Sequence, residues 1–352
     1  MDSFLPAKTN RSLHGFAVLT AVATFLLLGA GGLVTSHEAG MSVPDWPNSY
    51  GYNMFLFPPS KWIGGIFYEH THRLWATVVG LMTTILAVWL WFKDSRSWMK
   101  WLGVAAFLGV IAQGILGGLR VTLHMDNLGI FHGVVAQTFF ALICVIALFT
   151  GTFWHELMGQ KKIVFVPRGL RSHVLFVTIL IFLQLALGAT MRHQHAGLSI
   201  SDFPLAHGKI WPDTGPEAIA RYNAERMDVE AQNPITAFQV VLQMIHRLVA
   251  LLIFFGVTSS AGLAMKRLGR RDSLTRLALL WTALIVVQIG LGIETIWSNK
   301  AADIATAHVL VGALSLVTGV VWCIIAFGRS EPIAEIASPG IFGAQPSLAG
   351  SK

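Results

Sequence analysis

Eight long apolar runs, separated by shorter polar segments, dominate the sequence. A helix that spans the hydrocarbon core of a bilayer needs about 20 mostly apolar residues, and these runs fit that length. The pattern therefore predicts eight transmembrane helices. They are expected at residues 15–35, 72–92, 101–121, 131–151, 173–191, 242–264, 276–296 and 305–327.

The composition supports this fold class. Hydrophobic residues make up 54% of the chain and charged residues only 12%, about half the charged fraction of a soluble domain. The formal net charge is +7, but the basic residues lie in short loops between apolar runs, as membrane topology requires. We therefore predict an all-α, polytopic protein surrounded by membrane lipid, with no nucleic-acid partner.

The placement of Lys and Arg predicts the orientation. Basic residues gather in segments such as 93–100 and 266–276, whereas most acidic residues fall on the other side of the predicted bundle. Under the positive-inside rule, the basic segments and both termini are cytoplasmic, in a multi-pass protein of the cell (inner) membrane. The long segments 36–68 and 192–241 then face outward.

The sequence also repeats itself. The segment 39–47 (AGMSVPDWP) recurs as 196–204 (AGLSISDFP), each after an odd-numbered predicted helix. Further matches follow in the same order: His72-Arg73 with His246-Arg247, Gln113 with Gln288, Gly117 with Gly292, and His132 with His308. We therefore predict two four-helix bundles in tandem. These are an N-terminal unit over residues 1–160, a C-terminal unit over 161–330, and a flexible cytoplasmic tail over 331–352.

Four of the 13 histidines lie near the outer ends of even-numbered predicted helices: His72, His132, His246 and His308. An imidazole inside a membrane is costly unless it has a function. Two histidines on facing helices can bind haem iron from opposite faces, so the repeat predicts one pair in each unit. Interhelical hydrogen bonds are one alternative. Zinc is another, but it usually takes four ligands, often with cysteine, and both cysteines lie deep in apolar runs. Most other histidines are interpreted as solvated or interfacial.

Arg73 and Arg247 each follow a candidate ligand. Such a residue can hold a haem propionate through charge-assisted hydrogen bonds. Alternatively, it can extend to the membrane interface. The sequence leaves both interpretations open.

Glu69 distinguishes the two units. It precedes His72 by three positions, and Gln243 stands at the repeat-equivalent place. A carboxylate can exchange protons during a reaction, whereas an amide cannot. This asymmetry predicts proton-coupled chemistry in the N-terminal unit and a bound cofactor in the C-terminal unit. The alternative for Glu69 is a favourable charge at a helix N-terminus.

Together these motifs resemble the haem A synthase family across all eight predicted helices. The resemblance rests on the GGLVT sequence at 31–35, the GMSVPDWP sequence at 40–47, the Glu69-x-x-His72-Arg73 motif and the three later histidines. It implies a membrane oxidoreductase that converts the C8 methyl of its substrate, haem O, to a formyl group and so produces haem A. One departure is that many bacterial members carry a cysteine pair in the first outer loop, which is absent here.

The resemblance also implies roles for single residues. His72 and His132 would bind the haem being converted, with Glu69 essential to the chemistry, and His246 and His308 would bind haem B as a cofactor. We further expect contacts with the farnesyltransferase that makes haem O (haem O synthase) and with an unidentified electron-transfer partner. Two other functions stay open: a bis-histidine haem B cytochrome that only carries electrons, and a transporter with duplicated halves.

Overall fold

The computed structural model describes residues 10–158, 164–225 and 234–330, and regular structure in these ranges is helical. Eight helices within them are long and apolar enough to span a membrane, which confirms the predicted fold class. The predicted tail lies outside the described residues. The eight helices are α1 (Arg11–Ser36), α2 (Gly64–Lys93), α3 (Ser97–Thr122), α4 (Asn127–Thr150), α6 (Arg168–His193), α8 (Ala237–Leu268), α9 (Ser273–Trp297) and α10 (Ala302–Gly328).

Shorter helices lie in the connections. The first long loop, residues 37–63, contains the 3-10 turns η2 (Met54–Leu56) and η3 (Pro59–Lys61). The second, residues 194–236, contains η4 (Ala196–Leu198) and α7 (Pro216–Ala224). Helix α5 (Thr152–Met158) follows α4.

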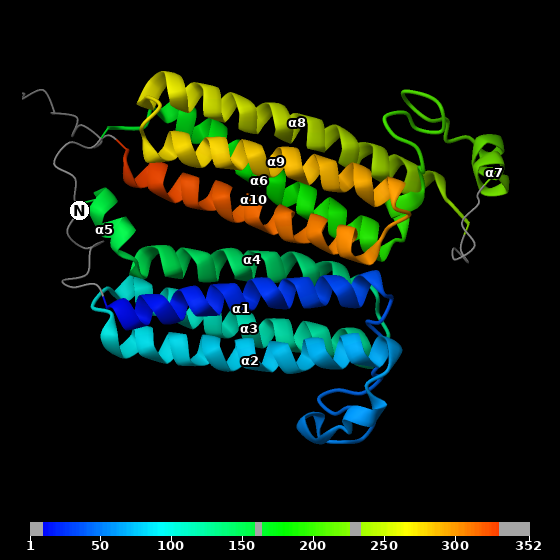
Figure 1. The fold of residues 1–352 in the computed structure, drawn as a ribbon, viewed down its shortest axis with the longest axis horizontal. Coiled ribbons are helices and arrows are strands. Elements are labelled where there is room, and N and C mark those ends of the chain that lie inside the picture. The colour runs from blue at the N-terminus through cyan, green and yellow to red at the C-terminus, as the bar shows by residue number, and fades with distance from the viewer. Residues whose placement is uncertain (1–9, 159–163, 226–233, 331–352) are drawn as a thin grey trace, which may run out of the picture.

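The eight long helices pack in two groups of four (Figure 1). In the first group, α1 and α3 each contact both α2 and α4. In the second group, α8 and α10 each contact both α6 and α9. The groups meet where α1 and α4 lie against α10 and α6. This is the grouping that two tandem four-helix bundles require, while the unit boundaries at residues 160 and 330 stay predictions.

Burial differs between central and peripheral helices in the same way in both groups. The most apolar 18-residue window is 44% buried in α4 and 56% buried in α10, but only 17% buried in each of α3 and α9. Apolar side chains that the protein leaves uncovered can contact lipid without losing stability. Helices α4 and α10 therefore form the centre of the molecule, and α3 and α9 form part of its lipid-facing periphery.

All eight spans begin before the predicted positions, and α2 differs most. Helix α2 starts at Gly64, and α8 starts at Ala237, where Thr236 and Gln239 form a capping box. The apolar run of α2 does not include its first turns, because they carry polar side chains such as Glu69 and His70. The earlier start of α2 places Glu69 and His72 on one continuous helix, whereas Gln243 and His246 already lie together in the predicted span at 242–264.

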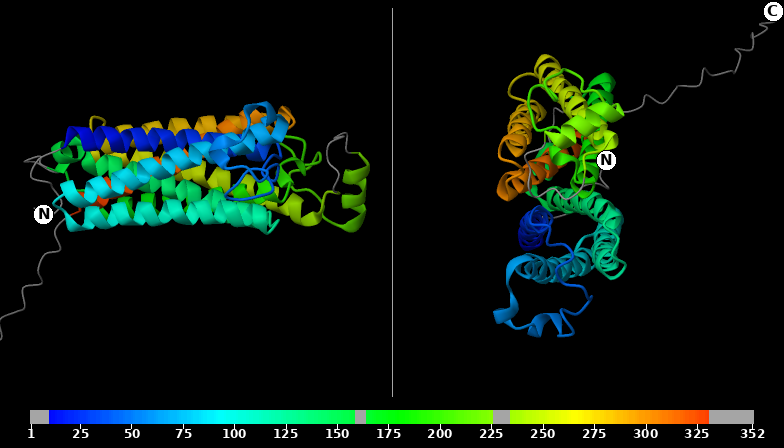
Figure 2. Two further views of the ribbon diagram at one scale, coloured as in Figure 1. Left: turned by 90° about the horizontal axis from the view of Figure 1, so that it is seen from below. Right: turned by 90° about the vertical axis from the view of Figure 1, so that its right-hand side faces the viewer.

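Both long loops emerge at one end of the bundle, which we call the loop end (Figures 1 and 2). The opposite end is held by buried ion pairs. Arg96 Nη2 lies 2.7 Å from Asp94 Oδ2, and Arg329 Nη2 lies 2.7 Å from Asp272 Oδ2. The four candidate histidines all lie toward the loop end, within the first three turns of α2, α4, α8 and α10.

Candidate functional site

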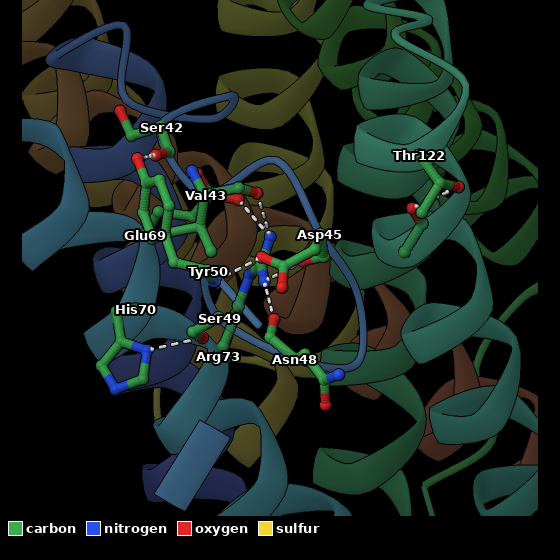
Figure 3. A network of polar contacts seen from close by, with 11 residues as sticks. Ser42, Val43, Asp45, Asn48, Ser49, Tyr50, Glu69, His70, Arg73 and Thr122 are labelled. Carbon is green, nitrogen blue, oxygen red and sulfur yellow. Dashed lines mark hydrogen bonds and ion pairs between the residues drawn. The ribbon is translucent and has the colours of Figure 1, made fainter. Parts of the chain in front are cut away.

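In the N-terminal unit, a carboxylate on α2 fastens the first long loop (Figure 3). Glu69 is 4% exposed. Its Oε2 accepts a hydrogen bond from the backbone N–H of Val43 at 2.7 Å, and its Oε1 pairs with Arg73 Nη2, also at 2.7 Å. The loop is thus bound to α2 by side chains within one turn of His72.

Arg73 binds the same loop through its guanidinium. Nη1 donates to the carbonyl oxygens of Asp45 and Asn48 at 2.6 and 3.1 Å, and Nη2 donates to the carbonyl oxygen of Val43 at 2.7 Å. With the bond to Glu69, both Nη groups have two acceptors each. The propionate contact stays a prediction, and in this structure Arg73 holds the loop.

In the C-terminal unit, a neutral amide makes the equivalent hydrogen bonds to the second long loop. Gln243 Oε1 accepts hydrogen bonds from the backbone N–H of Ile200 and the hydroxyl of Ser199, both at 2.8 Å. Ile200 is the repeat partner of Val43, so Gln243 and Glu69 bind equivalent backbone atoms. Fastening the loop therefore does not require a carboxylate at this position.

Arg247 also repeats the role of its partner. Nη1 donates to the carbonyl oxygen of Leu205, and Nη2 donates to that of Asp202, both at 2.9 Å. No hydrogen bond to Gln243 accompanies them among the described residues. The predicted propionate contact of Arg247 likewise stays a prediction.

The aspartates of the repeated loop segments are turn residues. Asp45 accepts hydrogen bonds from the backbone N–H groups of Tyr50 and Gly51, both at 2.7 Å. Asp202 accepts two equivalent bonds in its own turn, at 2.7 and 2.8 Å. The sequence repeat therefore extends to the hydrogen bonding of the loops.

His70, which separates Glu69 from His72 in sequence, belongs to the loop contact. Its Nδ1 lies 3.1 Å from the hydroxyl of Ser49. Its ring packs against Phe57 and Trp62, with centroid distances of 5.0 and 4.7 Å. It therefore anchors the loop and is not a candidate ligand.

In the C-terminal unit, the two candidate ligands face one another. The ring centroids of His246 and His308 are 6.5 Å apart. A bond from a metal to an imidazole nitrogen is about 2 Å long, so two imidazoles on opposite sides of one metal have centroids about 6 Å apart. In the N-terminal unit, the rings of His72 and His132 are close enough to interact electrostatically.

Glycines on neighbouring helices make room for all four rings. A Cβ atom added at Gly31 would lie 3.1 Å from His72 Cε1, and one added at Gly292 would lie 3.1 Å from His308 Cε1. The corresponding distances are 3.4 Å for Gly117 and His132, and 3.5 Å for Gly188 and His246. Each imidazole therefore lies against a backbone without a side chain.

The donor atoms of these rings fit an iron porphyrin. Nδ1 of all four histidines is buried, with no hydrogen-bond partner among the described residues: His72, His132, His246 and His308. The alternative of imidazoles held by interhelical hydrogen bonds would satisfy these nitrogens. Two imidazoles in each unit are the number that bis-histidine haem ligation needs. Within the described ranges, no three His, Cys, Asp or Glu side chains gather as a metal site.

Three of the candidate ligands are each contacted by one glutamine. Gln113 Nε2 donates to the carbonyl oxygen of His132 at 3.2 Å, and Gln184 Nε2 donates to that of His246 at 2.8 Å. Gln288 Nε2 lies 3.2 Å from His308 Nε2. His308 thus has one interhelical contact through Nε2, while its Nδ1 has no partner among the described residues.

Two residues near the candidate ligands were not predicted as site residues from the sequence. Arg120, in the last turn of α3, is close enough to His72 and His132 to influence both electrostatically. His193, interpreted as solvated or interfacial, packs against α4, because a Cβ atom at Gly129 would collide with its ring. Neither has a repeat-equivalent residue of its own type, and the internal repeat was the signal used to select candidates.

The fold and the site define a class of protein. It is a polytopic helical membrane protein with two repeated four-helix units, each bringing two imidazoles together near the loop end. The family model of COX15-CtaA, the cytochrome oxidase assembly proteins, matches residues 14–320. The chain belongs to this family.

Individual relatives agree with this assignment. The chain is 25% identical to a heme A synthase of Halalkalibacterium halodurans over 92% of this chain and 100% of that protein. It is 26% identical to a heme A synthase of Alkalihalophilus pseudofirmus over 89% of this chain and 98% of that protein. A heme A synthase of Shouchella clausii is 29% identical over 60% of this chain and 69% of that protein.

Proposed function

We propose that this protein is a haem A synthase, a membrane oxidoreductase that converts the C8 methyl of haem O to a formyl group. The observation that carries the proposal is the two pairs of histidines with buried, unpartnered Nδ1 atoms, of which the N-terminal pair has a carboxylate one turn from His72. Membership of the cytochrome oxidase assembly family and similarity to heme A synthases over nearly the whole chain support it.

The reaction makes demands that the N-terminal unit can meet. With water as the source of the oxygen, converting a methyl to a formyl group releases four protons and four electrons, so both must leave the site. We assign His72 and His132 to binding the substrate haem O and Glu69 to proton transfer. Glu69 is held by the bonds to Val43 and Arg73, which fix its carboxylate within one turn of His72.

The C-terminal unit is proposed to hold haem B between His246 and His308. A bis-histidine haem supplies one-electron transfer when bound. Gln243 cannot exchange a proton as a carboxylate does, which supports a cofactor role for this unit. The facing rings of His246 and His308 support the ligand assignment.

The surroundings of the protein follow from this assignment. We propose that it lies in the cell (inner) membrane with both termini cytoplasmic, so that the loop end faces outward. Haem O synthase would supply the substrate, and an electron-transfer partner would accept the electrons. The gathering of Lys and Arg in segments 93–100 and 266–276, at the end of the bundle opposite the long loops, supports this orientation.

Production of haem A in cells tests the proposal. The gene is expressed in a host that makes haem O but has no haem A synthase, and the haems are extracted with acid-acetone and separated by chromatography. We expect haem A to accumulate. The double variant His72→Ala, His132→Ala serves as the matched control and should retain haem B without making haem A.

Two outcomes would contradict the proposal. Haem B alone, unchanged when haem O is supplied, would favour a membrane cytochrome. Absence of any bound haem would favour the transporter with duplicated halves.

A further inference from the structure

The arginines that follow the candidate ligands are engaged by the loops, which leaves open what binds the acidic edge of a haem. Both Nη groups of Arg73 have two acceptors each, and both Nη groups of Arg247 donate to loop carbonyls. A carboxylate ligand would have to compete with these bonds. A different cation near the imidazole pairs is therefore better placed to bind that edge.

Arg120 is such a cation. It lies in the last turn of α3, one turn after Gly117, the glycine against which the ring of His132 lies, and it is close enough to interact electrostatically with both His72 and His132. Its side chain is 15% exposed. Its guanidinium lies against the loop backbone, since a Cβ atom added at Gly40 would be 2.6 Å from Nη1. The charge thus lies against the backbone of the first loop and is mostly covered by protein.

The hydrogen-bonding capacity of Arg120 is mostly unused. Its Nη2 lies 3.3 Å from the carboxylate of Asp126, which is 62% exposed, so this ion pair is long and at the surface. Its Nε is buried with no hydrogen-bond partner among the described residues. A guanidinium has five N–H donors arranged in a planar fork, suited to binding a carboxylate at two points.

This cation belongs to the N-terminal unit alone. Gly117 and Gly292 are repeat partners, so Arg120 corresponds to Thr295 in α9. The hydroxyl of Thr295 donates to the carbonyl oxygen of Leu291 at 2.7 Å and carries no charge. At this position the N-terminal unit has a cation and the C-terminal unit a neutral hydroxyl. The cation close to His308 in the C-terminal unit is Arg192 of α6, whose Nη2 already donates to the carbonyl oxygen of Gly32 at 3.0 Å and to the hydroxyl of Ser36 at 2.7 Å.

We propose that Arg120 binds a carboxylate of the tetrapyrrole held by His72 and His132, and so sets the orientation of the substrate. This inference rests on the proposed function. The propionates of a haem lie on one edge of the macrocycle, and binding that edge at the loop end directs the apolar edge toward the membrane interior. Arg120 is thus a specificity-determining residue of the N-terminal site.

Porphyrin binding tests the role of Arg120 without measuring activity. The full chain with His246→Ala and His308→Ala keeps only the N-terminal pair. It is titrated in detergent with ferric protoporphyrin IX and with its dimethyl ester, in which both carboxylates are blocked. Binding is followed by the absorption spectrum of bis-imidazole iron. We expect the free acid to bind about tenfold more tightly than the diester, as for a charge-assisted hydrogen bond.

Replacement of Arg120 should remove this preference. Arg120→Leu is expected to bind both porphyrins with the affinity that the parent shows for the diester, and Arg120→Lys should keep part of the preference. Unchanged diester binding by Arg120→Leu also shows that the variant is folded. A further control is Arg120→Leu in the His72→Ala, His132→Ala background, where porphyrin binding to the C-terminal pair should not change.

The failures of the two proposals differ. If Arg120→Leu retains the tenfold preference with an intact bis-imidazole spectrum, the role of Arg120 is overturned and the proposed function stands. If the parent binds neither porphyrin with a bis-imidazole spectrum, the N-terminal haem site and this inference are both overturned.

Discussion

In the N-terminal unit, Glu69 and Arg73 form an ion pair against the first long loop, whereas in the C-terminal unit Gln243 fastens the second loop as a neutral amide. The backbone atoms that they bind, in Val43 and Ile200, are repeat partners. The two units thus share a structural device and differ in its charge.

This difference distinguishes the structural role of the side chain, which is to hold the loop, from a possible chemical role of its charge. Since Gln243 holds its loop without a carboxylate, the charge of Glu69 is not needed for that purpose. Burial of an ionisable group is unfavourable unless it has partners, and Glu69 has two. A group that could be replaced by an amide yet remains a carboxylate is a candidate for proton transfer.

Removing the candidate ligands from one unit at a time should separate the roles of the two units most clearly. We expect His308→Ala to lose nearly all of the C-terminal haem, since one of two iron ligands is gone. His72→Ala should leave that haem bound and abolish haem A production. Haem content is measured from absorption spectra of the purified variants. His195→Asn, which changes an exposed histidine, is the control. A His308→Ala protein with full haem content would contradict the assignment.

Glu69→Gln makes the two units alike at this position, since the repeat-equivalent residue is Gln243. We expect haem A production to fall by at least about a hundredfold, because proton transfer is lost. Thermal stability should change by less than about 1 kcal/mol, because an amide can still accept the bond from Val43. Haem chromatography and thermal unfolding give the two values.

Glu69→Ala is the contrasting variant, since it also removes the fastening of the loop. It should lose about 1–3 kcal/mol as buried donors are left unpaired. Normal haem A output from Glu69→Gln would remove this residue from the mechanism.

The glycines beside the imidazoles give a graded comparison across both units. Alanine at Gly31 or Gly292 brings a methyl to 3.1 Å from a ring carbon. We expect these variants to bind haem about tenfold more weakly, for about 1.4 kcal/mol of overpacking. Alanine at Gly117 or Gly188 should have less effect, as the distances are 3.4 and 3.5 Å. Gly290→Ala, with nothing within 4 Å, is the control. Equal affinities for all five variants would show that the rings have room to shift.

The smallest expected effect concerns the second loop. Burial alone would raise the pKa of Asp202, but hydrogen bonds from the backbone of Gly208 and His207 outweigh this and lower the pKa below its ordinary value of 3.8. Because the folded-state pKa is the lower one, the stabilisation is present above about pH 4 and is lost as the pH falls through the folded-state value. Asp202→Asn should remove this dependence.

The measurement is thermal unfolding between pH 3 and about pH 6. We expect a difference of less than about 1 kcal/mol, because the group is partly exposed to solvent. A wild-type protein and an Asp202→Asn variant with parallel pH profiles would show that the charge of Asp202 does not stabilise the loop.

The sequence by itself determined the features that repeat along the chain. The eight spans follow from apolar length, because a bilayer sets how many residues a helix needs. The four histidines, and the loop segments that begin near Ala39 and Ala196, follow from comparing the chain with itself. Asp45 and Asp202 are turn residues whose hydrogen bonds reach only five or six positions along the chain, and short-range bonding of this kind is encoded locally.

The contacts of the arginines near the candidate ligands follow from the tertiary structure and not from the sequence pattern. Arg73 and Arg247 follow the candidate ligands in sequence, yet their guanidinium groups bind loop carbonyls that lie more than 20 residues earlier in the chain. Arg120 lies far from His72 in sequence and reaches it through the packing of α3 beside α2 and α4. Contacts between helices depend on how each helix is rotated about its axis, and neither apolar length nor the internal repeat specifies that rotation.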